Sequence, residues 1–137
     1  MPTGAASAVH QVVVPAEARS RVGHTLGRMP WLVVEDRVLA SIEIATTRAE
    51  RRRGLIGRDA IDGALVLRHT RAIHTFGVKF PIDVAYCDSS MCVVRTASVN
   101  PNRLCLPVFR ASSIVEAEAG SFARWGLRPG DVLEVRL

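Results

Sequence analysis

Short apolar stretches separated by turn-forming residues run through most of the chain, and they limit its fold more than any other feature. In the last stretch, Leu133, Val135 and Leu137 alternate with Glu134 and Arg136, which is the pattern of a half-buried strand. Similar stretches of roughly four to seven residues recur from residue 31 onward, with only two brief helical segments. The pattern predicts an all-β, mainly antiparallel fold: a β-sandwich or a partly closed barrel with one or two short helices.

The length of 137 residues suits one domain with a single core. Residues 1–30 carry prolines and glycines without sustained periodicity, so we predict a flexible or loosely packed leader there, with a short helical piece over residues 16–21. Residues 31–137 are predicted to form the single β-sandwich domain. We expect a cytoplasmic monomer or weak homodimer, because the sequence shows neither a secretory signal nor an apolar run of the roughly 20 residues that span a bilayer.

A capping box predicts where the first helix begins. Thr47 and Glu50 have the spacing in which each side chain can bond the backbone amide of the other residue. Gly54 can adopt the positive φ that commonly ends a helix. The arginines in and after this segment could bind an anion or form a solvated face beside acidic neighbours, and the second interpretation is favoured. These arginines are Arg48, Arg51, Arg52, Arg53 and Arg58.

The net charge of +5 and the isoelectric point near 10.1 raise the question of nucleic-acid binding. Apart from the cluster around residues 48–58, the basic residues are scattered along the chain. The aromatic residues stand mostly in apolar stretches, so they form no platform on which bases could stack. The charge pattern therefore predicts a basic surface, with a small molecule or a protein as the partner.

Cys87, Cys92 and Cys105 form no Cys-x-x-Cys pair and are odd in number, so we predict reduced, inert thiols. His69 and His74 would face opposite sides of a continuous strand, which argues against a shared metal ion. No phosphate-binding glycine loop or dinucleotide fingerprint is present in the sequence. The sequence therefore predicts neither a metal nor a cofactor.

The run from Ile73 to Val84 is the candidate site, because it places ionisable side chains in an otherwise apolar stretch. Read as a strand, it puts His74 in the inward, apolar row, while Thr75 and Lys79 point to the other face. Pro81 then interrupts the strand before a second one begins.

Asp83 lies in that second strand among apolar neighbours. A buried carboxylate without a hydrogen-bonding partner costs several kcal/mol, so Asp83 needs one. The simplest partner is His74, with Arg103 or a backbone amide as alternatives. Farther along, Glu116 and Glu118 share one face of an extended stretch, and we expect them to be solvent-exposed rather than catalytic, since nothing in the pattern would raise the pKa of either carboxyl.

The run Ile73–Val84 resembles the signature of the domain of unknown function 192 family. The resemblance covers about residues 38–137 and implies a compact antiparallel β-sandwich of jelly-roll type, with no established activity. Two departures, Ile56 and Val78, stand where the family usually has Met, and both are apolar residues of similar volume. The further matching segments are Ala45–Arg58, Pro101–Arg103, Ile114–Gly120 and Gly126–Asp131.

Two functional hypotheses follow. The favoured one is a noncatalytic binding or assembly module with a pocket or groove near His74 and Asp83. The alternative is a small, hydrolytic enzyme in which Asp83 orients His74 as a general base and Arg103 or Lys79 stabilises an anion. Beneath both lies a purely structural interpretation, a buried His74–Asp83 pair that fixes strand register. The candidate ligand-binding residues are His74, Thr75, Lys79, Asp83 and Arg103.

Overall fold

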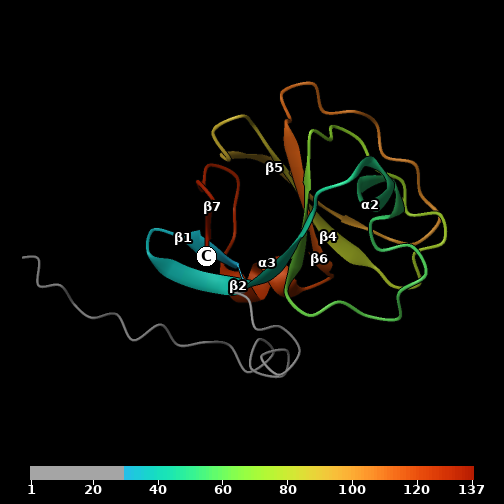
Figure 1. The fold of residues 1–137 in the computed structure, drawn as a ribbon, viewed down its shortest axis with the longest axis horizontal. Helices are drawn as coiled ribbons and strands as arrows, with labels where there is room; N and C mark the ends of the chain where they lie inside the picture. Colours follow the sequence, from blue (N-terminus) through green and yellow to red (C-terminus); the bar gives the residue numbers. More distant parts are fainter. Residues whose placement is uncertain (1–29) are drawn as a thin grey trace, which may run out of the picture.

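The computed structural model describes residues 30–137, so the leader and helical piece predicted before Pro30 lie outside the described residues. Seven strands and two short helices make up this part of the chain (Figure 1). In chain order they are β1 (Trp31–Val34), β2 (Arg37–Ala45), α2 (Arg48–Arg53), β3 (Ala64–Arg68), β4 (Ile82–Cys87), β5 (Val93–Val99), β6 (Ser113–Glu118), α3 (Ser121–Trp125) and β7 (Glu134–Arg136).

The strands form one mixed sheet in the order β5-β4-β6-β3-β2-β1-β7. Every neighbouring pair is antiparallel except β2 and β3, which run parallel. A parallel pair needs a long crossover connection, and residues 46–63, which include α2, supply it. The mainly β, mainly antiparallel character is confirmed. The jelly-roll topology is not confirmed, and the sheet is not closed, although an isolated bridge joins Cys92 to Val132 near its two edge strands.

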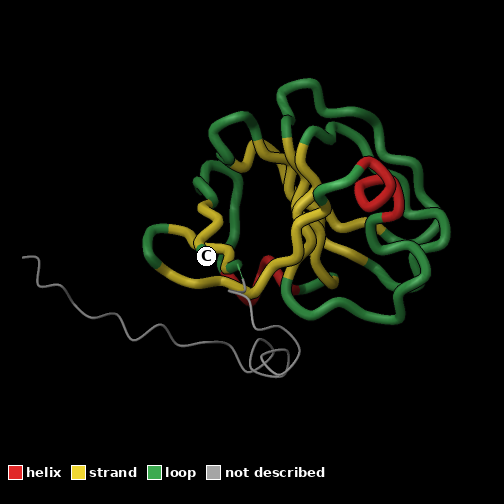
Figure 2. Tube along the Cα trace, in the orientation of Figure 1, coloured by secondary structure: helices red, strands yellow, loops and turns green. Residues whose placement is uncertain are grey.

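Two hydrophobic cores lie on opposite sides of the central strands β3, β4 and β6. On β6, Val115 and Ala117 belong to the first core, whereas Ile114 belongs to the second. The curled end of the sheet with β1, β2, β7 and α3 covers the first core, and α2 with the long loops covers the second (Figure 2). Both rows of side chains on these central strands are therefore buried. Polar side chains within these rows, such as Asp83 on β4 and Glu116 on β6, are buried whichever face they point to.

Helix α2 begins and ends where the sequence predicts, and α3 is the second short helix. In α2, the Glu50 amide donates to Thr47 Oγ1 (3.0 Å), and Gly54 ends the helix with φ +50°. In α3, Gly126 has a left-handed backbone, and Phe122 packs on the first core. No helix formed by residues 30–137 has the length and apolar character required to cross a bilayer.

The cysteines and the last strand complete the comparison with the sequence. All three cysteines are free, and burial raises the pKa of the Cys87 thiol to about 12, which keeps it protonated and inert. β7 pairs with β1, and Leu133 is buried just before it. The predicted inward position of Leu137 is wrong, because its side chain is 76% exposed beyond the end of the strand.

Candidate functional site

Residues 69–81 form a loop, not the predicted strand, and within residues 30–137 their one β-bridge joins His74 to Leu104. The predicted facing is reversed at its centre: Thr75 is fully buried, while His74 is exposed and Phe76 is 50% exposed. The Phe76 amide donates to His74 Nδ1 (3.2 Å), which holds the imidazole against its own loop. His74 thus lies on the outer wall of the domain instead of in an apolar row.

Thr75 joins this loop to the 100–111 loop. Its hydroxyl donates to the Asn100 carbonyl (2.7 Å) and accepts from the Arg103 amide (2.9 Å). Its backbone amide donates to the Arg103 carbonyl (2.8 Å), and its carbonyl accepts from the Asn102 amide (3.0 Å). All the polar groups of Thr75 are therefore engaged in holding two loops together.

Thr75→Val is expected to lower the free energy of unfolding by about 1 to 3 kcal/mol, because it leaves the inward-facing Arg103 amide without an acceptor at nearly constant volume. Thr75→Ser is the control, since it keeps the hydroxyl and loses only a methyl group. Urea unfolding of both variants measures the difference. A valine variant at least as stable as the serine variant would show that the hydroxyl does not stabilise the loop pair.

Asp83 is buried, and its partners differ from the pairing with His74 that the sequence favoured. The Ser98 hydroxyl donates to Oδ1 (2.9 Å), and the amides of Gly120 and Phe122 donate to Oδ2 (3.0 and 3.1 Å). The backbone amide named as an alternative is thus correct, and the His74 pairing is wrong. The reason is the direction of the side chain: Asp83 shares its side of β4 with Ala85 and the first core, whereas the 69–81 loop covers the second core.

The other two candidates lie at the surface. Lys79 makes an ion pair with Asp59 at 3.2 Å, and both side chains are largely exposed. The Arg103 side chain is exposed, and within residues 30–137 its one hydrogen bond goes to the carbonyl of Asn102, at 3.4 Å. The structure therefore does not bring the five predicted residues together: Thr75 and Asp83 are bonded within the fold, and of the five only His74 lines the cavity beside α2.

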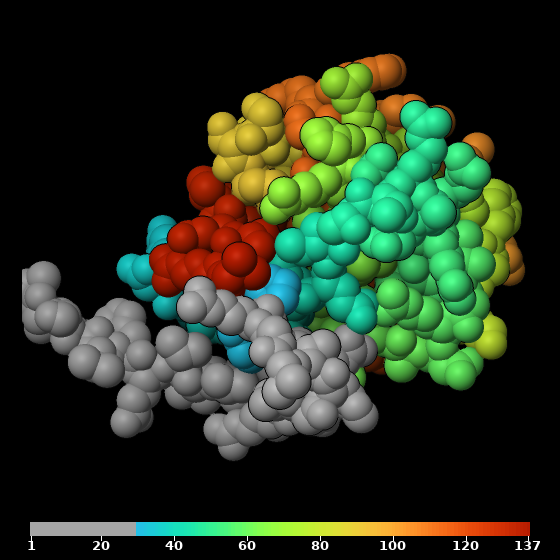
Figure 3. All heavy atoms as spheres, viewed as in Figure 1, coloured from blue at the N-terminus to red at the C-terminus, as the bar shows by residue number. Residues whose placement is uncertain are grey.

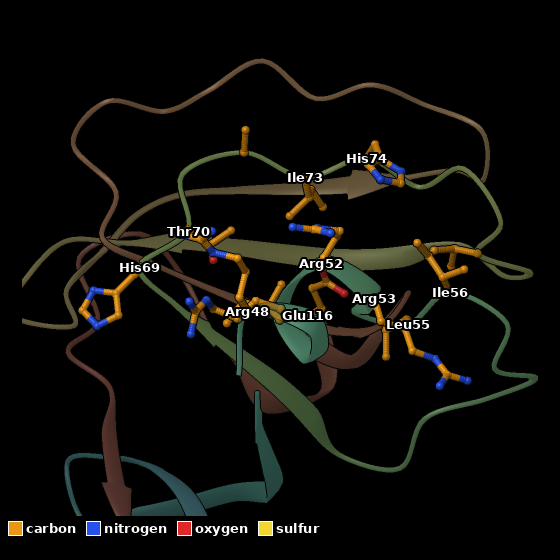
Figure 4. A pocket seen from close by; sticks show the side chains of 14 residues that line it. Arg48, Arg52, Arg53, Leu55, Ile56, His69, Thr70, Ile73, His74 and Glu116 are labelled. Carbon is orange, nitrogen blue, oxygen red and sulfur yellow. The ribbon is translucent and has the colours of Figure 1, made fainter. Parts of the chain in front are cut away.

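That cavity has a volume of about 520 Å³ and lies between α2 and the loop after β3. At the surface, the α2 segment and the residues after β3 lie side by side (Figure 3). Figure 4 shows Arg52 extending from α2 toward Ile73, with His69 and His74 at opposite ends. Its polar lining is Arg48, Arg51, Arg52, Arg53, His69, Thr70, His74 and Glu116; its apolar lining is Leu55, Ile56, Leu67, Ala72, Ile73 and Val78.

Glu116 is the residue that sequence reasoning missed. It is only 4% exposed, which makes the predicted solvent exposure wrong, whereas Glu118 is exposed as expected. β6 lies between β3 and β4, so Glu116 stands between Leu65 and Val84 and faces the second core. Burial raises the pKa of its carboxyl to about 7, and the nearby positive charge of Arg58 partly opposes this rise.

The sequence offered one signal for this burial. Because Val115 and Ala117 are as apolar as Ile114, the β6 segment reads as a strand covered on both faces, where any carboxylate is buried. Gly54 lies next to this carboxyl: a Cβ at position 54 would meet the two carboxylate oxygens at ordinary contact distances of 3.7 and 3.8 Å. Gly54 therefore both ends α2 and borders the buried acid.

Acidic side chains compensate little of the positive charge of the arginines around the cavity. Among residues 30–137, Arg48, Arg52 and Arg53 make no ion pair, and Arg51 donates to the Thr46 carbonyl (3.2 Å). Arg58 is different, because it pairs with Glu43 at 2.5 Å and is not part of the cavity lining. The cavity thus combines an arginine-rich wall, an apolar wall and one buried carboxyl.

Comparison with known proteins agrees with this fold. A crystal structure of a protein of unknown function from Novosphingobium aromaticivorans DSM 12444 is similar, with a TM-score of 0.66 and 21% identity, over 77% of this chain and 83% of that one. A crystal structure from Sinorhizobium meliloti 1021, titled a "putative transcription regulator", has a TM-score of 0.66 and 20% identity, over 77% of this chain and 91% of that one.

No curated protein matches the chain significantly. The sequence profile of the DUF192 family, described as "Uncharacterized ACR", matches residues 32–135, which include every strand except the ends of the first and last. This chain therefore belongs to the domain of unknown function 192 family.

Proposed function

We propose that the protein is a noncatalytic binding module and that its cavity beside α2 binds a small organic anion. The observation that carries the proposal is the unbalanced charge of the lining: four arginines, none of which makes an ion pair within residues 30–137, line a cavity whose one acidic residue is Glu116. Guanidinium groups bind carboxylates and phosphates through paired hydrogen bonds, so this wall suits either anion.

The opposite wall indicates the rest of the ligand. Leu67, Ile73 and Val78 are apolar parts of the lining, and they belong to or pack against the second core. Ligand sites of this size are typically apolar with a few polar groups that fix orientation. A ligand with one anionic group and a compact apolar body therefore matches the cavity better than a bare ion.

Glu116 sets the condition for binding. Because its pKa is about 7, a large share of the carboxyl is protonated at neutral pH, and in that form it can donate a hydrogen bond to an anion. An ionised carboxylate at the same place would repel the ligand. The site is thus expected to hold its anion more tightly at pH 6 than at pH 8.

The alternative, a hydrolytic enzyme, has less support. In that hypothesis Asp83 orients His74, yet both oxygens of Asp83 accept hydrogen bonds from Ser98 and α3. His74 accepts from the Phe76 amide within its own loop. Binding without catalysis is the simpler function for such a lining, while the cytoplasmic location and the monomer or weak homodimer remain predictions.

Thermal unfolding with phosphate, benzoate and phenyl phosphate tests the proposal. We expect phenyl phosphate to stabilise the protein most, by about 2.7 kcal/mol at 100 times its dissociation constant. Arg52→Gln should weaken this binding about tenfold or more, since it removes a charged hydrogen-bond donor. Arg128→Gln is the matched control, because that exposed arginine lies outside the cavity lining.

Two results would contradict the proposal. One is the absence of any shift with all three compounds at pH 6. The other is an equal loss of binding in Arg52→Gln and Arg128→Gln, because it would mean that the anions respond to overall charge and not to the cavity.

A further inference from the structure

A second surface, separate from the cavity, exposes large apolar side chains on two neighbouring loops. Leu104, Leu106 and Phe109 are 73%, 80% and 81% exposed, and Phe76 on the adjoining loop is 50% exposed. We name these four residues the apolar rim. Exposed apolar side chains scattered singly need no explanation, but a group of this kind on one surface indicates an interaction site.

The backbone holds the apolar rim together. The Cys105 amide donates to the Ile73 carbonyl (3.0 Å) and the Val108 amide to the Arg71 carbonyl (3.0 Å), so the 100–111 loop runs along the 69–81 loop. The His74–Leu104 bridge belongs to the same contact, and the His74 and Phe76 rings lie 5.5 Å apart. Leu104 is thereby held beside the part of the loop that carries Phe76.

The same loop also anchors itself to the domain. Cys105 and Val108 are partly buried against the second core, so the residues between and beside them point outward. Phe109 lies in the turn that the Ala111 amide closes on the Val108 carbonyl (2.9 Å). The exposure of the apolar rim therefore follows from how the loop is anchored.

The charge around the apolar rim has one sign. Residues 68–81 and 99–112 contain no Asp or Glu, and they carry Arg68, Arg71, Lys79, Arg103 and Arg110. Within residues 30–137, only Lys79 of these five makes an ion pair, with Asp59. Apolar side chains that protrude between arginines match a surface that is anionic outside and apolar beneath.

We propose that the apolar rim inserts into the surface of an anionic lipid bilayer, with Arg103 and Arg110 held at the level of the phosphates. Side chains that are 73–81% exposed protrude and are not recessed, which suits insertion into lipid better than docking of a peptide in a groove. A second copy of this chain is a poorer occupant, because it would bring the same uncompensated arginines face to face.

Sedimentation with vesicles tests the lipid surface on the full chain. We expect binding to phosphatidylcholine vesicles that contain about 30% phosphatidylglycerol, and at least tenfold weaker binding to pure phosphatidylcholine. Added salt should weaken the binding to the anionic vesicles. The Leu106→Ser/Phe109→Ser variant should lose at least tenfold in affinity while keeping the unfolding temperature of the original chain, because both side chains are exposed.

The Val132→Ser/Leu137→Ser variant is the matched control, since it removes two exposed apolar side chains that lie outside the apolar rim, 56% and 76% exposed. It should bind vesicles like the original chain. Equal losses in both variants, no binding to anionic vesicles, or binding that ignores lipid charge would each overturn the proposal. A concentration-dependent dimer that only the Leu106→Ser/Phe109→Ser variant loses would assign the apolar rim to a second copy instead.

Discussion

Asp83→Ala is expected to lower the free energy of unfolding by about 2 to 4 kcal/mol. The carboxylate accepts three hydrogen bonds, one from the Ser98 hydroxyl and two from the amides of Gly120 and Phe122. Alanine leaves both amides without an acceptor beside the first core. It also removes the side chain that caps α3, since Gly120 provides none.

Asp83→Asn separates the hydrogen bonds from the charge. The asparagine oxygen can accept from both amides, and its amino group can donate to Ser98 once that hydroxyl turns to accept. What it loses is the negative charge at the start of α3, so we expect a smaller cost of about 1 kcal/mol. Urea unfolding of the two variants measures both costs. An alanine variant as stable as the original chain would instead mean that Asp83 belongs to a site built against stability.

The difference between the predicted and observed partners of Asp83 shows what periodicity can and cannot determine. Alternation correctly placed Asp83 among apolar neighbours on a strand that begins after Pro81. It could not say which face of the sheet the preceding loop would cover. That depends on the path of residues 69–81 across the second core, which long-range contacts fix.

Thr75 and His74 show a related limit. Treating residues 73–80 as a strand assigned inward and outward faces by sequence position, but a loop has no period, and hydrogen bonds decide which side chains face inward. Thr75 is buried because its polar groups all find partners in the 100–111 loop. The helices were easier to predict, because the signals at Thr47, Glu50 and Gly54 are local.

The arginine cluster was found in the sequence, but its significance was not. Without the position of Glu116, Arg48 and Arg52 read as a solvated helix face, which is the commoner role for such residues. Only the crossover from β2 to β3 places α2 over the second core, beside the buried carboxyl. The candidate cavity thus depends on topology more than on any motif.

The second large effect concerns pH. Glu116→Gln is expected to become more stable relative to the original chain by up to about 3 kcal/mol as the pH rises from 4.5 to 8. In the unfolded chain the Glu116 carboxyl has its ordinary pKa of 4.5, and in the folded chain burial raises the pKa to about 7. Between these values the folded state holds more protons, so the original chain loses stability as the pH rises through this window, while glutamine cannot titrate.

The difference in the free energy of unfolding between the two proteins at each pH reports on Glu116 alone, because the other carboxyls titrate alike in both. Urea unfolding at pH 5, 6, 7 and 8 measures this difference, and Glu118→Gln, which removes an exposed carboxyl on the same strand, is the control. If Glu116→Gln gave a constant difference, the folded state would not hold the extra proton. The carboxyl would then be charged at neutral pH, and Arg58 and the cavity arginines would balance its charge. In that case the cavity would bind anions without the preference for low pH that a protonated Glu116 predicts.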